Sequence, residues 1–339
     1  MIHASEKLLR SFPPLPRKNP IMTEILPSVL IIGYQRVQNV ERIVKICIAE
    51  GIRSIYISVD FPKNKDKISL ENYSAILGIG AKFQNSSITF KYNTYSKNLG
   101  CATHVISACD WVFELETNVI ILEDDCLPSK YFFKYCSYYF QLERQMENLI
   151  LASGSQFAPN PDNSSGTTLS KYALIWGWAT TRQHWEKIKR GVCDSGNRKW
   201  NLWEFDQEKI YWQEGARRAK MGFVDVWDTS LVNFIWQSEY YSLAPKNNLV
   251  SNVGDDQLAT HTSSDFTWLR KETGEFCQVD ESLPVLNLKS EAFLKNEFYQ
   301  IRKRHLFSTR VTRVRDLLNR GKKTSLFDSV RYAKDFQIE

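Results

Sequence analysis

Short apolar segments alternate with helical patterns through the first part of the chain, and this alternation limits the fold more than any other feature. The apolar runs occupy residues 28–34, 55–60, 88–92 and 119–122. After the first run, Ile43, Ile46 and Cys47 follow a helical spacing that stops at Gly51. Strands separated by helices pair in parallel, because the crossover helix returns the chain to the same end of the sheet. The pattern predicts an α/β fold with a doubly wound, mostly parallel sheet.

The fourth apolar run, residues 119–122, has the sequence VIIL and is followed directly by acids. A strand without polar residues belongs in a sheet that is buried on both faces. Ligands of doubly wound sheets bind outside the carboxyl ends of the strands. Glu123, Asp124 and Asp125 stand at that end. We therefore expect the functional site there.

Three consecutive carboxylates repel one another, so a bound cation is a simple way to stabilise Glu123, Asp124 and Asp125. Mg²⁺ or Mn²⁺ takes one or two carboxylates together with substrate phosphates, which suits a metal-bridged nucleotide diphosphate. The alternative is a solvated acidic turn that caps the helix after Pro128. The fold class and the position at a strand end favour the cation site.

Several blocks of the sequence occur in a characteristic order. They are 98–101 (NLGC), 110–113 (DWVF), 120–129 (IILEDDCLPS), 176–180 (WGWAT), 248–254 (NLVSNVG) and 259–262 (ATHT). Together these blocks resemble the GT-A nucleotide-sugar glycosyltransferases, and most of all bacterial sugar transferases related to the N-acetylglucosaminyltransferase that initiates complex N-glycans. The resemblance covers roughly residues 27–265 and implies a GT-A fold, which is Rossmann-like.

The same resemblance implies how the acids divide their roles. Asp125, the last acid of the triplet, would hold the metal, and Asp124 and Glu123 would face the ribose and the donor sugar. A histidine late in the domain completes the metal site of many metal-dependent relatives, which makes His261 a candidate ligand. The alternative for His261 is an ordinary surface histidine.

The resemblance also implies a set of residues that bind the nucleotide. Tyr34 belongs to this set, and Arg36 and Asp60 match positions that grip the base, which a guanidinium or a carboxylate can do by hydrogen bonding. The alternative for Arg36 and Asp60 is a polar pair near a helix start. Lys97 stands where the family has arginine, so it would meet the pyrophosphate as a point charge rather than as a bidentate fork.

Inverting sugar transfer needs a carboxylate that takes the proton of the acceptor hydroxyl. Asp228, in the family's Trp-Asp segment, is the candidate base; the alternative is a plain helix N-cap, and Asp225 is the neighbouring candidate. Trp176 and Trp178 either form a stacking wall for the acceptor sugar or belong to the core.

Composition bears on the compartment of the protein. The seven cysteines include no CxxC pair, which argues against a disulfide framework or a zinc cage and predicts free thiols. No apolar run approaches the ~20 residues that cross a bilayer, and the first residues lack the profile of a secretory signal peptide. The sequence predicts a cytoplasmic protein.

The end of the chain is strongly basic. Residues 298–334 contain eleven Lys or Arg and two Asp, a net charge of +9 within a chain of +6. We expect a flexible arm at 1–24, a glycosyltransferase domain at 25–265 and a basic helical extension at 266–339, separable from Phe298 onward. The extension either contacts anionic lipid on the inner face of the plasma membrane or packs on the domain as a solvated helix. No nucleic-acid-binding module is recognised, so no nucleic-acid partner is expected.

Together these features predict a metal-dependent, inverting glycosyltransferase of the hexosyltransferase class. It would move a sugar from a UDP- or dTDP-sugar to a glycan or lipid-linked acceptor hydroxyl in surface polysaccharide biosynthesis. One alternative is a sugar-1-phosphate nucleotidyltransferase, although its Gly-rich signature after the first strand is absent. The other is a non-catalytic scaffold that binds a sugar or a lipid.

Overall fold

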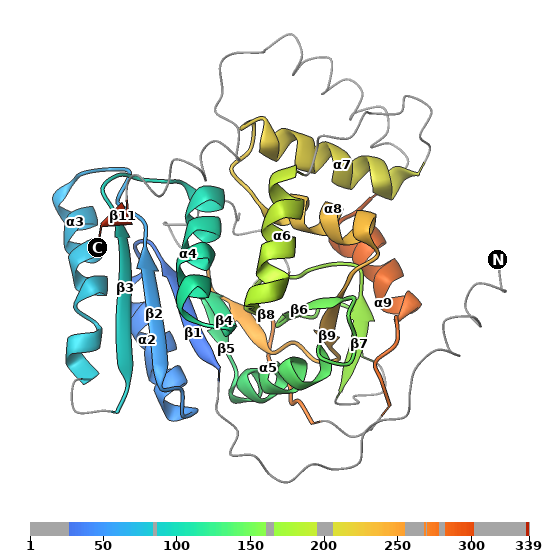
Figure 1. The fold of residues 1–339 in the computed structure, drawn as a ribbon, viewed down its shortest axis with the longest axis horizontal. Helices are drawn as coiled ribbons and strands as arrows, with labels where there is room; N and C mark the ends of the chain where they lie inside the picture. Colours follow the sequence, from blue (N-terminus) through green and yellow to red (C-terminus); the bar gives the residue numbers. More distant parts are fainter. Residues whose placement is uncertain are drawn as a thin grey trace.

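The computed structural model describes residues 27–83, 87–160, 166–194, 206–254, 268, 270–277, 282–301 and 337–338. Within these residues a single large sheet runs through the molecule, and helices cover both of its faces (Figure 1). A separate two-stranded sheet lies beside it. The chain therefore has the predicted α/β class.

The first half of the large sheet is the predicted strand and helix series. Its strands are β1 (Ser28–Gly33), β2 (Ser54–Val59), β3 (Thr89–Tyr95) and β4 (Asn118–Glu123). The connecting helices are α2 (Val37–Ala49), α3 (Lys67–Leu77), followed by a 3-10 turn (Gly80–Phe83), and α4 (Cys101–Leu115). β1 pairs in parallel with β2 and β4, and β2 pairs in parallel with β3. The doubly wound parallel arrangement is confirmed.

Alternating side chains of β1 bury against helices on opposite faces of the sheet. Val29 and Ile31 pack with Val40 of α2, whereas Leu30 packs with Val105 of α4. Successive side chains of a strand point to opposite faces, so an all-apolar strand needs a cover on both. The same reason explains β4, whose residues 119–122 are fully buried and divide between the same two clusters.

The second half of the sheet mixes strand directions. It contains β6 (Leu149–Ser153), β7 (Thr167–Ser170), β8 (Trp178–Thr181) and β9 (Tyr241–Pro245), and the full order is β11-β3-β2-β1-β4-β8-β6-β9-β7, where β11 is Gln337–Ile338. β8 pairs antiparallel with both β4 and β6. β7 pairs antiparallel with β9, and β11 pairs antiparallel with β3. β6 and β9 pair in parallel. Six described strands therefore run in one direction and three in the other, so the sheet is mostly parallel.

The remaining elements surround this second half. β5 (Cys126–Pro128) follows β4 and pairs antiparallel with β10 (Val250–Asn252) to form the small sheet. The further helices are α5 (Lys130–Leu142), α6 (Arg182–Asp194), α7 (Gln207–Lys220), α8 (Asp228–Ser238) and α9 (Leu288–Phe293), which continues into a π-helical turn (Leu294–Phe298). In Figure 1, α6, α7 and α8 lie together on the side of the sheet that carries α4.

The segment that contains α9 is part of the core rather than a detached appendage. Phe298 stacks on Phe157 with ring centroids 4.5 Å apart, and Tyr299 contacts Trp212 at 4.7 Å. Ile301 is only 2% exposed. The expectation that the chain is separable from Phe298 onward is therefore wrong for residues 298–301, because their apolar side chains pack in the core.

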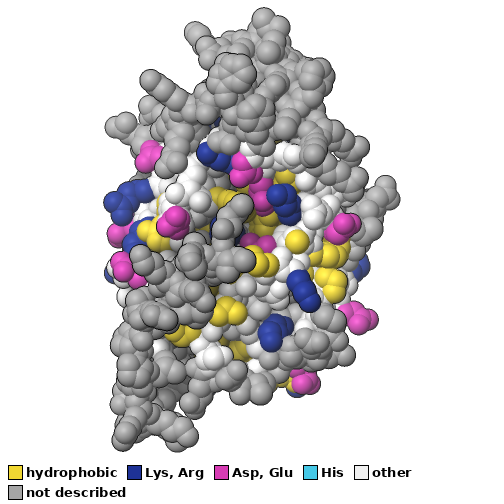
Figure 2. Space-filling model, turned by 90° about the vertical axis from the view of Figure 1, so that its right-hand side faces the viewer, with side chains coloured by type: hydrophobic (Ala, Val, Ile, Leu, Met, Phe, Trp, Pro, Cys, Tyr) yellow, Lys and Arg dark blue, Asp and Glu magenta, His cyan; other side chains and the backbone are white. Residues whose placement is uncertain are grey.

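The other sequence expectations about the ends of the chain meet the limits of the described residues. The arm at 1–24 and most of the basic extension, residues 302–336, lie outside them, as does the expected boundary at 265. Of the helices that the structure describes, none has the length and apolar character needed to span a bilayer. All seven cysteines are free thiols, as predicted. Figure 2 shows one face of the molecule, on which acidic, basic and apolar side chains surround a central hollow.

Candidate functional site

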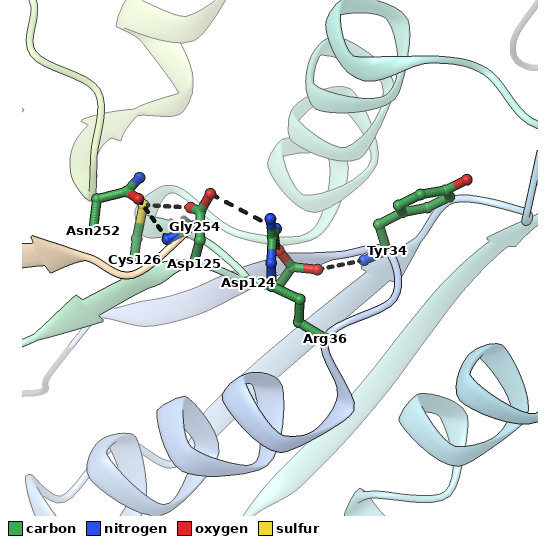
Figure 3. Close-up of polar contacts among 7 residues, drawn as sticks. All are labelled: Tyr34, Arg36, Asp124, Asp125, Cys126, Asn252 and Gly254. Carbon is green, nitrogen blue, oxygen red and sulfur yellow. Dashed lines mark hydrogen bonds and ion pairs between the residues drawn. The ribbon is translucent and has the colours of Figure 1, made fainter. Parts of the chain in front are cut away.

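Asp124 joins the ends of β1 and β4 at the centre of the sheet. Its backbone N–H donates to the carbonyl of Ile32 at 3.0 Å. One carboxylate oxygen accepts the backbone N–H of Tyr34 at 2.8 Å, and the other accepts Nη1 of Arg36 at 2.8 Å (Figure 3). The side chain is almost fully buried, and it is satisfied by these two donors. The structure thus brings together three residues that the sequence analysis selected.

Asp125 lies between Arg36 and the end of β10. Its carboxylate is 3.7 Å from Nη1 of Arg36 and accepts a hydrogen bond from Sγ of Cys126 at 3.2 Å (Figure 3). A Cβ added to Gly254 would come within 2.4 Å of this carboxylate, so a larger residue there would displace the Asp125 side chain. The Gly254 N–H is held by the side-chain oxygen of Asn252 at 2.8 Å. The chain after β10 therefore forms one wall of the Asp125 site.

The three acids carry more negative charge than Arg36 balances. The pKa of Glu123 is raised to about 8, first by burial and then by the charges of Asp125, Asp124 and Asp228. Burial and the charge of Asp124 also raise the pKa of Asp125, against the opposing effect of Arg36. A divalent cation placed here would relieve this repulsion.

The donor set fits a cation that is shared with a substrate. Among the described residues, no group of three or more His, Cys, Asp or Glu side chains has the arrangement of a metal site made by protein alone. Mg²⁺ and Mn²⁺ are commonly held by one or two carboxylates and completed by phosphate oxygens and water. Asp125 is suited to be such a carboxylate. The other predicted ligand, His261, lies outside the described residues.

Two aspartates hold the loop that leads into α4. Asp60, at the end of β2, accepts the backbone N–H of Leu99 at 2.8 Å and that of Gly100 at 3.1 Å. Asp225 accepts the next two, from Cys101 at 2.8 Å and from the residue that follows it at 2.9 Å. Four consecutive N–H groups at a helix start would otherwise lack intrahelical acceptors. The two carboxylates form a clamp, defined here as Asp60, Asp225 and the 99–102 loop.

The clamp contains two residues that the sequence analysis considered: Asp225 as the neighbouring candidate base and Asp60 as a residue that binds the nucleotide. Both oxygens of Asp225 accept backbone N–H groups, so this residue has a structural role at the start of α4, and its role as the neighbouring candidate base remains a prediction. Burial raises the pKa of Asp60 to about 7, against the opposing effect of its backbone hydrogen bonds. Asn98 also donates to Asp60, at 2.9 Å. Contact between Asp60 and a nucleotide base remains a prediction.

Asp228 is the first residue of α8, and Trp227 occupies the N-cap position. The Asp228 carboxylate accepts the N–H of Thr229 at 2.7 Å. Its charge helps to raise the pKa of the half-buried Cys101 thiol, after the larger effects of burial, Glu123 and Asp225. Its charge also helps to raise the pKa of Glu123, so the candidate base lies within electrostatic reach of the acidic triplet.

The remaining predicted residues are placed as follows. Lys97 is exposed in the loop before α4, and the Tyr34 hydroxyl accepts the backbone N–H of Lys63 at 3.1 Å. Trp178 is 1% exposed and belongs to the core, which decides between the two readings of that residue. Trp176 is half-buried and packs edge-on against Phe157.

Sequence reasoning did not select several residues that shape the site. Asn252 and Gly254 position Asp125, and their signal was an Asn-Val-Gly segment noted only as part of the block at 248–254. Tyr211 of α7 and Tyr299 have pKa values raised by burial and then by the charge of Asp228. No sequence pattern connects these tyrosines to Asp228, because they come from distant parts of the chain.

Comparisons with known proteins find only low similarity to solved structures. No protein-family model and no curated protein sequence matches the chain. A structure of UDP-glucose pyrophosphorylase complexed with UDP-glucose is similar at a TM-score of 0.37 and 11% identity, covering 65% of this chain and 89% of that chain. The apo structure of WbbM, a bifunctional glycosyltransferase, is similar at a TM-score of 0.31 and 9% identity, covering 52% of this chain and 35% of that one. The assignment of function therefore depends on the residues of the site.

Proposed function

We propose that the chain is a metal-dependent, inverting glycosyltransferase that uses a UDP- or dTDP-activated sugar. The observation that carries the proposal is the group formed by Arg36, Asp124 and Asp125 at the carboxyl ends of β1 and β4. This is the edge at which doubly wound sheets bind ligands. Carboxylates with raised pKa values in such a place, here Glu123 and Asp125, are typical of functional sites.

The nucleotide-sugar donor would be bound by this group and by the residues around it. Asp125 would hold the cation, with His261 as the second candidate ligand, and the bound cation supplies positive charge to the diphosphate leaving group. Arg36 orients Asp124 and Asp125, because it contacts both carboxylates. Tyr34, Asp60 and Lys97 would line the nucleotide side.

Asp228 would act on the acceptor. A general base must reach the hydroxyl from the face opposite the leaving nucleotide. The charge of Asp228 helps to raise the pKa of Glu123, which supports a place for Asp228 near the acidic triplet. The acceptor would be a hydroxyl of a glycan or of a lipid-linked sugar, in surface polysaccharide biosynthesis on the cytoplasmic side of the membrane.

The test is a screen of UDP- and dTDP-sugars for thermal stabilisation and for hydrolysis, with and without Mn²⁺. Asp125→Asn is expected to weaken Mn²⁺-dependent UDP binding ~10-fold or more, because a charge-assisted contact is lost. Glu71→Gln, a change of an exposed carboxylate on α3, is the matched control and should bind UDP normally. Unchanged Mn²⁺-dependent affinity in Asp125→Asn would refute the metal assignment.

The same assay separates transfer from the alternative reaction. A glycosyltransferase releases the nucleoside diphosphate from the sugar nucleotide. A nucleotidyltransferase instead consumes pyrophosphate and releases a nucleoside triphosphate and a sugar 1-phosphate. Formation of the triphosphate would overturn the proposed reaction class.

A further inference from the structure

A cavity of about 300 Å³ lies beside α2 and the β5–β10 pair. Two arginines, Arg42 and Arg270, line it together with the hydroxyl residues Ser129, Ser251 and Thr273. Among the described residues that line this cavity, none is Asp or Glu. The described lining therefore offers cationic and hydroxyl donors.

The cavity is on the other side of the β5–β10 ladder from the acidic site. Ser251 pairs with Leu127, and Asn252 pairs with Cys126. Because side chains alternate along strands, each of these pairs faces its own side of the ladder. Ser251 and Leu127 line the cavity, whereas Cys126 contacts Asp125 (Figure 3). The cavity and the acidic site are thus two separate places that share one wall.

Ser129 connects the cavity to the start of α5. It occupies the N-cap position, yet its side chain makes no capping hydrogen bond. Its hydroxyl oxygen is buried and has no hydrogen-bond partner within the described part of the chain. A buried polar atom of this kind is normally satisfied, and the positive end of a 13-residue helix is next to it. An anion in the cavity would accept a hydrogen bond from the Ser129 hydroxyl and would be stabilised by the positive end of α5.

The two arginines reach the cavity from different segments. Arg42 makes no ion pair with any residue that the structure describes, while the neighbouring Glu41 pairs with Lys45 at 2.8 Å and also with Lys82. Arg270 has φ 52°, and its N–H donates to the carbonyl of Asn252 at 2.8 Å. Left-handed backbone is uncommon for a residue other than glycine, and such strain clusters at binding sites.

We infer that this cavity binds the phosphate group of a small soluble molecule, such as a sugar phosphate. Guanidinium groups bind phosphate through paired hydrogen bonds, and hydroxyls and a helix N-terminus add further donors. Donors from two arginines, three hydroxyl residues and a helix start suit an anion with three or four acceptor oxygens better than a carboxylate with two. The inference goes beyond the proposed transfer reaction and does not rest on it.

The probe is inorganic phosphate, titrated into the full chain in the presence of EDTA and followed by thermal shift and calorimetry. EDTA removes the metal-dependent route to the acidic site, and potassium chloride of equal ionic strength controls for salt. We expect saturable stabilisation of the wild-type chain by phosphate. Arg42→Gln should weaken phosphate binding ~10-fold or more, because it removes a charged donor. Lys45→Gln, a change on the same helix outside the cavity, should bind like wild type.

Two further variants separate this site from general effects on stability. Ser129→Ala should unfold at the wild-type temperature without phosphate, because no capping bond is lost, and should still bind phosphate more weakly. Asp125→Asn should keep the wild-type phosphate response, because it lies across the ladder. Loss of phosphate binding in Asp125→Asn would instead assign the anion to the acidic site and overturn the inference.

The remaining outcomes that contradict the inference are clear. The absence of saturable binding by the wild-type chain, or equal phosphate affinity in Arg42→Gln and Lys45→Gln, would overturn it. A third outcome is Arg42-dependent binding to phosphatidic acid vesicles without any response to inorganic phosphate. It would mean that the cavity binds a lipid headgroup, and it would overturn the inference of a small soluble ligand.

Discussion

Three adjacent carboxylates of the site have three different surroundings. Asp124 is satisfied by a backbone N–H and by Arg36, whereas Asp125 is farther from that guanidinium and contacts Cys126. Glu123 has a pKa of about 8 because burial and its acidic neighbours disfavour its charge. At the scale of the residue, different contacts with Arg36 and with the neighbouring acids give each carboxyl group a different electrostatic environment.

Asp228 and Asp225 differ in what they hold, so the same substitution should affect them differently. Asp228→Asn keeps an oxygen for the Thr229 N–H but removes the carboxylate that would accept a proton. We expect nucleotide-sugar binding to survive and kcat to fall by ~10² to 10⁴. Steady-state kinetics measures kcat, and a titration with the nucleotide sugar measures its binding.

The controls for that experiment use the other aspartates. Asp66→Asn changes an exposed carboxylate that caps the start of α3 and should leave kcat unchanged. Asp225→Asn should lower the free energy of unfolding by ~1–3 kcal/mol, because one backbone N–H loses its acceptor. A wild-type kcat in Asp228→Asn would remove Asp228 from the role of base.

Gly100 is required by the clamp for two reasons. Its φ is +81°, and an added Cβ would lie 2.6 Å from a carboxylate oxygen of Asp225. Gly100→Ala should therefore lower the free energy of unfolding by more than the ~1 kcal/mol expected from backbone strain alone. Gly166→Ala is the matched control, because Gly166 has φ +139° and no atom within 4 Å of the added Cβ. Urea unfolding of both variants measures the difference, and equal losses would contradict the clamp.

At the scale of the element, helix starts depend on distant acceptors. α4 begins at a glycine that offers no capping side chain, and the two carboxylates of the clamp come from β2 and from the segment before α8. A loop next to the nucleotide side is thus tied to the segment that carries Asp228. This connection is absent from any local pattern around residue 100.

Glu291 links α9 to β7 and makes this contact sensitive to pH. Ser170 donates to its carboxylate at 2.6 Å and the Lys171 N–H at 3.1 Å. Burial nevertheless raises the pKa of Glu291 to about 7, with Glu208 adding to the rise and the charge of Lys171 opposing it. A carboxyl whose folded pKa lies above its unfolded value of 4.5 contributes stability that is present at acid pH.

The stability that Glu291 contributes should be complete below about pH 4.5 and lost as pH rises through about 7. Glu291→Gln removes this titration, so its unfolding free energy should vary less with pH across that window than that of the wild-type chain. Denaturant unfolding at several pH values measures the slope. Glu297→Gln, an exposed position on the same segment, should keep the wild-type slope; an unchanged slope in Glu291→Gln would refute the assignment.

At the scale of the whole molecule, the C-terminal segment closes the second half of the sheet. A chain that ends at residue 301 keeps Leu294, Phe298 and Tyr299 in the core and loses the short β11 pairing. A chain that ends at residue 287 exposes all of these side chains, each worth ~1.5–3 kcal/mol when fully buried. We expect the first chain to unfold near the temperature of the full chain and the second to unfold ~10 °C or more below it. Thermal unfolding of the two chains measures this, and equal melting temperatures would show that the segment is not part of the core.

Much of the first half of the fold was predictable because its determinants are local. The apolar run at 119–122 needs cover on both faces, and the helical spacing after Gly33 fits one helix between two strands. The parallel half of the sheet and the acids at its edge follow from these patterns. The strands of the second half pair with mixed directions, and no local pattern sets the partner of β8 or β9.

By itself the sequence determined the α/β class, the position of the acidic triplet at a strand end and the free thiols, because hydrophobic periodicity and residue type act over a few residues. Only the tertiary structure decided that Arg36 joins Asp124 to Asp125, that Asp225 holds the start of α4, and that Trp178 belongs to the core. Each of these depends on contacts between segments far apart in the chain. Such contacts are selected by packing and charge in three dimensions, where sequence distance carries no information about spatial distance.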